Sequence, residues 1–284
     1  MRHYEGLVLS AGAAGGYYHL GALHALWTEG ACFQNLKYLA GSSVGAAICM
    51  LLTVGYTPVE LFATLCTKDV NKLFDFEVGN LSTKWGFIDN KKFYGYLESL
   101  VLDKMHYVPT FSQLLNETKK SLIVPSWCVT DAERKHKVYF SPKTHPDMNI
   151  IDAVMCSCNI PVLFTRAEID NHLWVDGGLF DKCPANFLKG YMAEAGEENF
   201  RVAVLNLVWS QNKKETPKTL MQYIKSICYI TLKTQTNPVS DEFLDVMPIE
   251  SELNEMSLQI DLKNRIDIFT NTYNAFRAKL KDVV

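Results

Sequence analysis

The stretch from Tyr38 to Ala47 constrains the fold more than any other part of the chain. A short apolar run enters it and a run of small, apolar residues from Val44 to Val54 leaves it, which is the pattern of a strand, a very tight turn and a helix. Gly41 and Gly45 lie two residues either side of Ser43. Because the two limbs of so sharp a corner nearly touch, its flanks need residues without side chains. We therefore expect the hydroxyl of Ser43 to project from the end of a sheet at a helix N-terminus.

The Gly-x-Ser-x-Gly pattern alone is weak evidence for a nucleophile. It occurs by chance in about one chain in ten of this length. The alternative is a glycine-rich turn that packs a helix on a strand. The strand–turn–helix context favours a nucleophilic serine, and two further stretches decide between these interpretations.

The same order of elements precedes this corner. Residues 6–10 have the composition of a short buried strand, residues 11–16 are only Gly and Ala, and residues 17–27 have helical spacing. Two successive strand–loop–helix units predict an α/β fold, with a mostly parallel sheet covered by helices. Ligands of such sheets bind at the carboxyl ends of the strands, where both loops lie.

The loop of small residues predicts a close approach between backbone and ligand. We expect the N–H groups of Gly12 and Ala13 to form an oxyanion hole, which stabilises the negative oxygen that develops during acyl transfer. A dinucleotide-type phosphate loop is a second interpretation, but in the register that ends at Gly16 its first two glycines are Ala11 and Ala13. Close packing of a helix on a strand is a third.

Asp176 is the second anchor of the predicted site. It follows the apolar run Leu173–Val175 and precedes Gly177 and Gly178, so it lies at the end of a predicted strand. Asp-Gly-Gly is also a common turn, and its value as evidence comes from the pairing with Ser43.

A serine nucleophile needs a base, and the histidines do not supply one in the usual order. They are His3, His19, His24, His106, His136, His145 and His172. None follows Asp176, so the order Ser, Asp, His of α/β-hydrolases cannot be built on that residue. An earlier carboxylate with His136, His145 or His172 remains an alternative. The simpler arrangement is a dyad in which Asp176 accepts the proton of Ser43, and a closed apolar site should raise the carboxyl pKa for this task.

Composition excludes several classes. The chain has 284 residues, 48% apolar and 21% charged, with a net charge of -3. Such a chain can bury a sizeable core, and it has no basic footprint for nucleic acid. The eight cysteines show no CxxC spacing, so we expect reduced thiols in a cytoplasmic compartment and no structural metal site. The longest apolar run, residues 46–56, is too short to span a bilayer, so any membrane contact should be peripheral.

The remaining elements are predicted from periodicity and turn signals. Strands are expected at residues 121–131, 137–141 and 201–208, and helices at 57–67, 90–102, 150–158, 185–192, 220–232 and 251–281. Residues 69–102 carry aromatic side chains among Gly and polar residues. We interpret them as a satellite core, with a lid or an acyl-chain slot as the alternative.

The three anchoring stretches, in this order, resemble the patatin-like phospholipase family. The matching segments are Leu9–Gly16, Gly41–Gly45 and Asp176–Gly178. The sequence between and after these segments also resembles the family, at Tyr18–Leu23, Ser157–Phe164 and Pro184. The resemblance covers about residues 5–190. It implies a three-layer α/β/α sandwich, with residues 200–284 adding a strand and helices to a single domain 1–284. It also implies hydrolysis of lipid acyl esters by a Ser43–Asp176 dyad, without a metal or other cofactor.

The sequence departs from the family pattern in the loop before the first helix. The family loop usually reads Gly-Gly-Gly-x-Arg/Lys-Gly, whereas here Gly15 stands at the basic position and Ala11 and Ala13 replace two glycines. Alanine can serve in an oxyanion hole if its φ is negative, because only its N–H is used. Lys182 stands where Asn is common in the family.

These observations predict a metal-independent serine acyl hydrolase that acts on phospholipid or lysophospholipid esters. The predicted site comprises the nucleophile Ser43, the base Asp176, the oxyanion donors Gly12 and Ala13, and a set of motif glycines: Gly15, Gly16, Gly41, Gly45, Gly177 and Gly178. A catalytically weak lipid-binding protein of the same fold is the alternative from another class, and the altered loop is its support. Acyl transfer to an acceptor other than water is the closer alternative.

Overall fold

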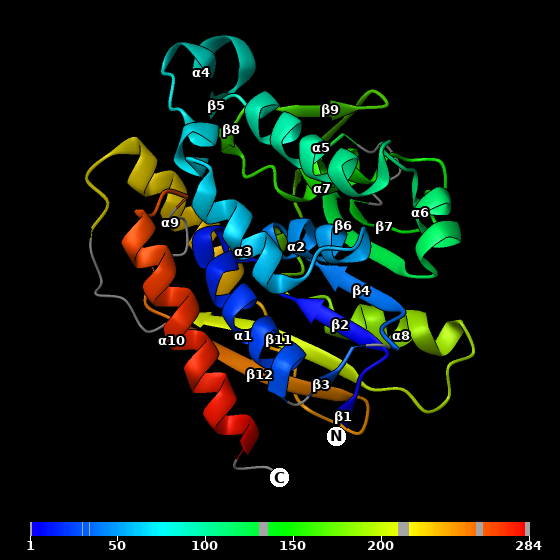
Figure 1. The fold of residues 1–284 in the computed structure, drawn as a ribbon. Coiled ribbons are helices and arrows are strands. Elements are labelled where there is room, and N and C mark those ends of the chain that lie inside the picture. Colours follow the sequence, from blue (N-terminus) through cyan, green and yellow to red (C-terminus); the bar gives the residue numbers. More distant parts are fainter. Residues whose placement is uncertain are drawn as a thin grey trace.

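The fold is built around one mixed β-sheet with helices on both of its faces (Figure 1). The computed structural model describes residues 2–29, 31–33, 35–130, 136–209, 216–253 and 258–281. Within these ranges the sheet has eight strands. They are β2 (Gly6–Leu9), β4 (Tyr38–Gly41), β6 (Ser121–Cys128), β7 (Lys137–Phe140), β9 (Ala167–Ile169), β10 (His172–Asp176), β11 (Val202–Trp209) and β12 (Leu244–Ser251).

Strand direction divides the sheet into two parts. The strand order is β12–β11–β2–β4–β6–β10–β9, and β7 also pairs with β6. All pairs from β12 to β6 are parallel, whereas β10, β9 and β7 are antiparallel to their neighbours. Two short parallel pairs lie outside this sheet: β1 (Arg2–His3) with β3 (Ala31–Cys32), and β5 (Gly86–Ile88) with β8 (Val162–Phe164).

The antiparallel direction of β10 brings two strand ends together. The β4–β6 ladder ends at the pair Ala40–Ile123, whereas β10 pairs with the last part of β6, from Asp176–Ser126 to Trp174–Cys128. The carboxyl ends of β4 and β10 therefore both reach the middle of β6, from opposite directions.

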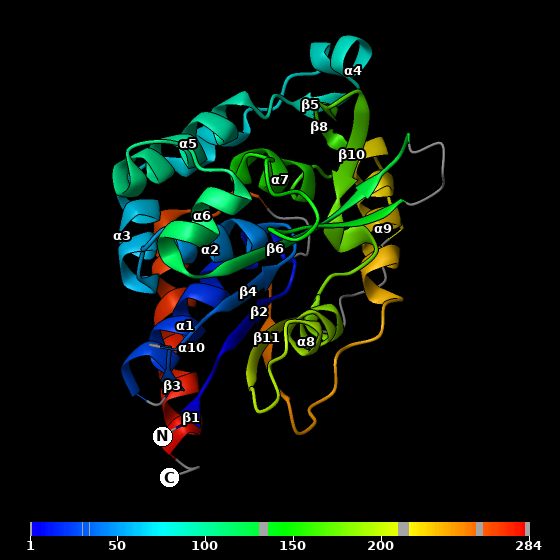
Figure 2. The ribbon, with the colours of Figure 1, turned by 90° about the vertical axis from the view of Figure 1, so that its right-hand side faces the viewer.

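Helices fill the outer layers of the molecule. They are α1 (Gly16–Glu29), α2 (Val44–Thr53), α3 (Pro58–Thr67), α4 (Gly79–Lys84), α5 (Lys91–Met105), α6 (Phe111–Thr118), α7 (Ile150–Ser157), α8 (Ala185–Glu194), α9 (Leu220–Lys233) and α10 (Leu262–Lys281). Figure 2 shows α1, α2, α3 and α10 on one side of the sheet and α8 and α9 on the other. This is the three-layer α/β/α sandwich that the sequence predicts.

Side chains of the central strands alternate between two cores. Leu7 and Leu9 of β2 lie in the larger core with α1, α2 and α7, whereas Val8 lies in the smaller core with α8. Residues of β4 and β6 alternate in the same way. Each such fully buried aliphatic side chain stabilises the fold by about 1.5–3 kcal/mol. Burial on both faces accounts for the continuous apolar runs in these strands.

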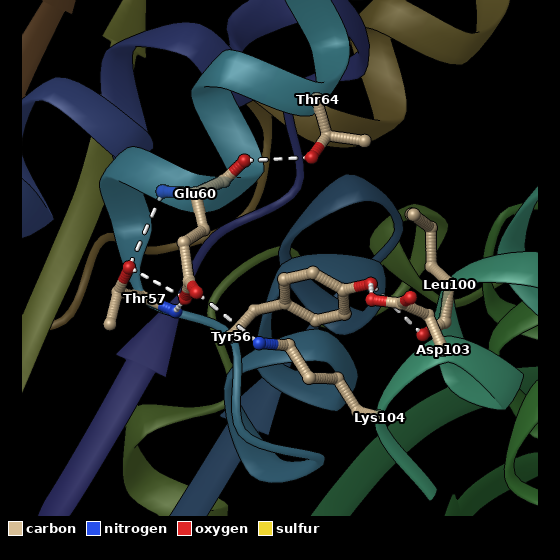
Figure 3. Close-up of polar contacts among 7 residues, drawn as sticks. All are labelled: Tyr56, Thr57, Glu60, Thr64, Leu100, Asp103 and Lys104. Atoms are coloured by element: carbon tan, nitrogen blue, oxygen red, sulfur yellow. Dashed lines mark hydrogen bonds and ion pairs between the residues drawn. The ribbon is translucent and has the colours of Figure 1, made fainter. Parts of the chain in front are cut away.

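A polar cluster joins α3 to α5 at the surface of the larger core (Figure 3). The Thr57 hydroxyl accepts the N–H of Glu60 over 3.3 Å, and the Glu60 carboxylate accepts the N–H of Thr57 over 2.7 Å, which forms a capping box. Glu60 also pairs with Lys104 at 3.2 Å, and the Tyr56 hydroxyl donates to Asp103 over 2.9 Å. The cluster fixes the chain just beyond α2, the helix that begins at the serine corner.

Most of the longer elements agree with the sequence prediction, whereas the short elements α4, β5, β8 and β9 are not predicted and one longer region differs. The sequence indicates helices through residues 251–281, but Ser251 ends strand β12 and α10 begins only at Leu262. The alternating apolar pattern of β12 is weak in the sequence, because most side chains of this edge strand are not fully buried. Residues 254–257 of the expected helix and residue 131 of the expected strand 121–131 lie outside the described residues.

Part of the aromatic segment at residues 69–102 forms a satellite core, whereas two of its aromatic side chains, Phe76 and Trp85, are exposed. Phe87 and Ile88 of β5 pack with Leu163 and Phe164, and Ile224 of α9 lies against the same cluster.

Across the described ranges, no single helix is long and apolar enough to cross a membrane. Helices α2 and α3 reach that length and apolar content only as a pair, and the pair is bent by 117°.

Candidate active site

Ser43 occupies a strained corner between β4 and α2. Its backbone has φ 54° and ψ −124°, a conformation that non-glycine residues rarely adopt. The Ser43 hydroxyl donates a hydrogen bond to Oδ2 of Asp176 over 2.7 Å. Both side chains are buried. The structure thus brings together the two residues that the sequence pairs across the sheet.

The corner is as tight as a chain permits. A Cβ atom on Gly41 would lie 2.3 Å from the carbonyl of Gly45, and one on Gly45 would lie 2.4 Å from the carbonyl oxygen of Leu9. Both contacts are with backbone, which has no room to move aside. Glycine at these two positions is therefore a steric requirement of the geometry that places the Ser43 hydroxyl at the carboxyl end of β4.

Asp176 ends β10 and caps the short 3₁₀ helix η3 (Gly177–Leu179). Its Oδ1 accepts the N–H of Gly178 over 2.7 Å, so each carboxylate oxygen has one donor. A Cβ on Gly177 would lie 2.0 Å from the carbonyl oxygen of Pro125, and one on Gly178 would lie 2.8 Å from Cβ of Ala11. The two glycines let this turn pack against β6 and against the loop of small residues.

Burial controls the protonation of Asp176. Removal of the carboxylate from water raises its pKa from 3.8 to about 7, although the hydrogen bonds from Ser43 and Gly178 act in the opposite direction. A carboxyl group with this pKa exchanges protons near neutral pH. It can therefore accept a proton from a reacting hydroxyl far better than an exposed aspartate can.

The loop of small residues lies beside this pair. Gly12 and Ala13 line the same cavity as Ser43 and Asp176. Within the described residues, the N–H groups of Gly12 and Ala13 donate no hydrogen bond to the protein. Both are free to bind an oxygen in the cavity, and α2 begins at Val44 on the other side of Ser43.

Packing against β11 sets the shape of this loop. A Cβ on Gly12 would lie 2.2 Å from Cδ1 of Leu207, and one on Gly15 would lie 2.8 Å from the same atom. Gly16 approaches α2, where a Cβ would lie 2.8 Å from Cγ2 of Val44. Gly15 and Gly16 therefore leave room for Leu207 and α2, and a side chain at position 15 would require the Leu207 side chain to shift.

Ala13 does not have the negative φ expected of an alanine in this loop. Alanine replaces glycine without strain only where φ is negative, but φ of Ala13 is 46°. The left-handed conformation costs an alanine about 1–2 kcal/mol. Ala13 starts the 3₁₀ helix η1 (Ala13–Gly15), in which Gly15 N–H donates to the Gly12 carbonyl over 2.6 Å, and this tight turn imposes the unusual φ.

Two polar residues at the C-terminal end of α7, Ser157 and Asn159, support both halves of the site. The Ser157 hydroxyl accepts the backbone N–H of Ser43 over 3.1 Å. The Asn159 carbonyl accepts the N–H of Asp176 over 2.9 Å, and its side-chain amide donates to the carbonyl of Trp174 over 2.8 Å. Neither residue has a role in the prediction from sequence. The sequence could have indicated them, because they are polar residues inside an apolar run, and buried polar groups need hydrogen-bond partners.

His19 supports the loop from behind. It is fully buried on α1, and its Nε2 lies 2.9 Å from the carbonyl oxygen of Ser10. Burial lowers the pKa of His19 to about 4, so the ring is neutral and Nε2 carries the proton that Ser10 accepts. The Ser10 hydroxyl in turn accepts the N–H of Leu207 over 2.8 Å. These contacts fix the chain as it enters the loop.

The cavity above Ser43 is small and largely apolar. Its volume is about 20 Å³, and Ile160, Leu179, Cys228 and Leu232 complete its lining. A cavity needs about 10–15 Å³ to hold one water molecule, so this one admits a water but no acyl chain. No histidine is among the described residues that line it.

Metal ligands do not gather anywhere in the described part of the chain, where no group of three or more His, Cys, Asp and Glu side chains could hold an ion. The seven cysteines whose side chains are described are all free thiols. Six of them are buried, and only Cys66 is partly exposed.

A model of the patatin-like phospholipase family matches residues 7–189, a range that runs from β2 into α8 and includes the serine corner and β10. This chain belongs to the patatin-like phospholipase family. The matched range holds Ser43, Asp176 and the loop of small residues.

Two viral proteins are similar to this family member in sequence. "Probable lipid hydrolase 463L" of Invertebrate iridescent virus 6 is 30% identical over 197 residues, which cover 67% of this chain and 65% of the viral protein. An uncharacterized protein of Acanthamoeba polyphaga mimivirus is 25% identical over 279 residues, which cover 93% of this chain and 90% of the relative. The chain thus spans a little under two thirds of the first of these relatives.

Two solved structures share the fold of this patatin-like chain. VipD from Legionella pneumophila aligns with a TM-score of 0.60 at 16% identity, over 98% of this chain and 67% of VipD. The type III effector protein ExoU aligns with a TM-score of 0.52 at 14% identity, over 98% of this chain and 53% of ExoU. At these identities the likeness establishes the α/β/α fold.

Proposed function

We propose that this protein is a serine acyl hydrolase that cleaves ester-linked fatty acids from phospholipids or lysophospholipids. The observation that carries the proposal is the 2.7 Å hydrogen bond from the Ser43 hydroxyl to the buried Asp176 carboxylate, at a strained strand–helix corner. Membership of the patatin-like phospholipase family and similarity to a viral protein named as a probable lipid hydrolase support the substrate class.

In the first step Ser43 attacks the ester carbonyl while Asp176 takes its proton. The hydrogen bond already places that proton between the two oxygens, so no side chain has to move. The pKa of about 7 at Asp176 keeps a large fraction of the carboxyl ionised near neutral pH and still makes it a useful base. The proton then passes to the leaving alcohol.

The negative oxygen of the tetrahedral intermediate needs donors that are in place beforehand. Gly12 and Ala13 line the cavity, and their N–H groups have no protein acceptor within the described residues. We assign the oxyanion hole to these two groups, with a contribution from the N-terminus of α2 at Val44. Loss of one such donor typically reduces kcat by about 10²–10³-fold.

In the second step water hydrolyses the acyl-enzyme. Asp176 removes a proton from a water molecule, the hydroxide attacks the acyl carbonyl, and Ser43 leaves with the proton that Asp176 returns. The cavity has the volume for one water molecule beside these two residues. The proposed activity requires no metal ion, and it takes place in a cytoplasmic compartment with peripheral contact to a membrane.

The test is release of free fatty acid from lysophospholipid and phospholipid in the presence of a chelator. The variants are Ser43→Ala and Asp176→Asn, with folding of both checked by circular dichroism. We expect activity in the wild type and losses of at least about 10³-fold in each variant.

Three other outcomes have distinct meanings. A folded wild type that is inactive on lipids and on short-chain esters refutes the hydrolase proposal and favours the lipid-binding alternative. Loss of activity with the chelator refutes metal independence. Consumption of the ester with transfer of its acyl group to an added alcohol instead of water indicates an acyltransferase.

A further inference from the structure

Helix α9 covers the cavity above Ser43. Cys228 and Leu232 on its inner face line the cavity, and Ile224 packs in the satellite core with Phe87 and Leu163. The helix packs mainly on η3, the turn that follows Asp176. Figure 2 shows it at the periphery of the layer that also holds α8. One face of α9 therefore closes the site.

A second face of α9 is also apolar, and it is exposed. We call Leu220, Tyr223, Ile227 and Ile230 the outer stripe, since steps of three and four residues place them along one side of a helix. Their exposed fractions lie between 47% and 61%. A surface helix of a soluble fold usually carries polar residues on this side. One apolar face of α9 is therefore buried against the cavity and the satellite core, and a second apolar face is exposed.

Charge identifies the class of partner that fits this exposed face. Residues 216–240 contain three lysines, Lys218, Lys225 and Lys233, and no Asp or Glu, in a chain with a net charge of -3. Lysine beside tyrosine and aliphatic residues is the composition of helices that lie in the interface of a membrane. Each lysine close to an anionic lipid surface strengthens binding by about fivefold.

The closed cavity requires a change before a lipid can react. Its volume of about 20 Å³ admits no acyl chain, and part of its lining is formed by Cys228 and Leu232 of α9. We propose that α9 is a lid whose outer stripe docks on an anionic lipid surface, and that docking moves α9 away from Ser43. This inference rests on the proposed function, because it assigns the step that admits the lipid substrate to the same site.

A polar latch holds the closed position. Nε2 of Gln235, two residues beyond α9, donates to the carbonyl of Gly178 over 2.7 Å, and its Oε1 accepts the N–H of Lys182 over 2.7 Å. Both partners belong to the segment that follows Asp176. A side-chain amide between two backbone groups is a contact that water can replace when the lid opens.

The first experiment measures docking without catalysis. All proteins carry Ser43→Ala, and they are sedimented with vesicles of phosphatidylcholine plus phosphatidylserine or of phosphatidylcholine alone. The test variant is Ile227→Ser with Ile230→Ser. The matched control is Leu262→Ser with Ile266→Ser on α10, because the exposed fractions of these residues, 49% and 44%, are similar.

We expect stronger binding to the anionic vesicles and a loss of about tenfold or more in the test variant, with no loss in the control. Equal losses in both variants, or none in either, would refute docking through the outer stripe. Light scattering of the wild type without lipid completes this test, because a dimer that the test variant dissociates would show that a second copy covers the stripe.

The second experiment measures opening. Proteins with an intact Ser43 hydrolyse a soluble short-chain ester, with and without vesicles of a non-hydrolysable ether phospholipid containing phosphatidylserine. We expect vesicles to raise the wild-type rate by about tenfold or more, because α9 then leaves the cavity. Gln235→Ala should raise the rate without vesicles and reduce this stimulation, because the latch is gone.

The outcomes separate the lid from the proposed function. An enzyme that hydrolyses the ester at the same rate with and without vesicles retains the proposed function and refutes the lid. A protein that docks as expected but hydrolyses neither ester nor lipid refutes the proposed function. Loss of activity in Gln235→Ala under both conditions would assign Gln235 to positioning of the Asp176 turn and would overturn its role as a latch.

Discussion

The Ser157 hydroxyl accepts the backbone N–H of Ser43 over 3.1 Å, and both residues are buried. This N–H belongs to the residue with φ 54°, so the bond holds the backbone of the strained corner. The segment from Ser157 to Asn159 binds Ser43 at one end and the backbone of Asp176 at the other. A single short segment thus sets the separation of the two halves of the site.

Replacement of Ser157 by alanine removes the acceptor of the Ser43 N–H without adding bulk. We expect kcat to fall by roughly tenfold with little change in KM, and the free energy of unfolding to fall by about 1–2 kcal/mol. Ser141→Ala is the control, since Ser141 is equally buried and bonds Thr144 away from the site. An unchanged kcat in Ser157→Ala would show that the bond is structural only.

The pH dependence of activity follows from Asp176. Below its pKa of about 7 the carboxyl carries a proton and cannot accept that of Ser43. We expect kcat/KM for a soluble ester to be level above about pH 7 and to fall tenfold for each pH unit below it. A pH–rate profile of the wild type measures this. A profile that stays level down to pH values near 5 would mean that Asp176 keeps an ordinary carboxyl pKa.

The pH dependence of stability has the opposite direction from that of activity. The folded protein binds a proton at Asp176 up to about pH 7, whereas an unfolded aspartate releases it near pH 3.8. Between these values the folded state holds more protons, so the free energy of unfolding falls as pH rises, by up to about 4 kcal/mol. Asp176→Asn should lack this decrease. Urea unfolding of both proteins between about pH 4 and 8 provides the measurement, and equal slopes would contradict the prediction.

Strain at Ala13 can be relieved by one substitution. Glycine adopts φ 46° without the cost of about 1–2 kcal/mol that alanine bears, although its unfolded chain gains about 0.5–1 kcal/mol in entropy. We expect Ala13→Gly to raise the free energy of unfolding by up to about 1 kcal/mol and to retain activity. Ala14→Gly, one residue on, lacks a positive φ and should be destabilising. Thermal denaturation of both variants tests the contrast.

Two glycine-to-alanine substitutions distinguish a glycine that close packing requires from one that it does not. A Cβ at position 41 would lie 2.3 Å from the Gly45 carbonyl, so Gly41→Ala should destabilise the fold by more than about 3 kcal/mol or abolish folding. Gly95 lies within α5 and a Cβ there meets nothing within 4 Å. Gly95→Ala should therefore raise the free energy of unfolding by about 0.5–1 kcal/mol. Denaturant titration of both variants is the measurement.

Local patterns in the sequence predict much of the fold. The corner around Ser43 is predictable because close approach of two backbones demands glycine at fixed positions. The buried strands β2, β4 and β11 are predictable because both faces of the sheet are covered. Strand β12 is missed because it lies at an edge, and a half-buried strand carries a weaker pattern.

The supporting contacts of the site lie beyond what local patterns can predict. Ser157 is separated by 114 residues from its partner Ser43, and Ser10 by 197 from Leu207. Hydrogen bonds over such separations depend on the arrangement of strands, which the chain order of motifs does not give. The positive φ of Ala13 is also missed, because it belongs to the tight 3₁₀ turn that the Gly15 N–H closes on the Gly12 carbonyl, and residue types alone do not specify that turn.

The place of β11 next to β2 has a consequence for the order in which the protein is made. Ser43 and Asp176 leave the ribosome before β11, but the loop that holds Gly12 takes its shape only when Leu207 is beneath it. If Ser43 and Asp176 act as proposed, a nascent chain that ends before β11 holds both residues but lacks the strand against which the loop packs. The proposed activity then requires synthesis of β11, and an incomplete chain should not hydrolyse lipid esters.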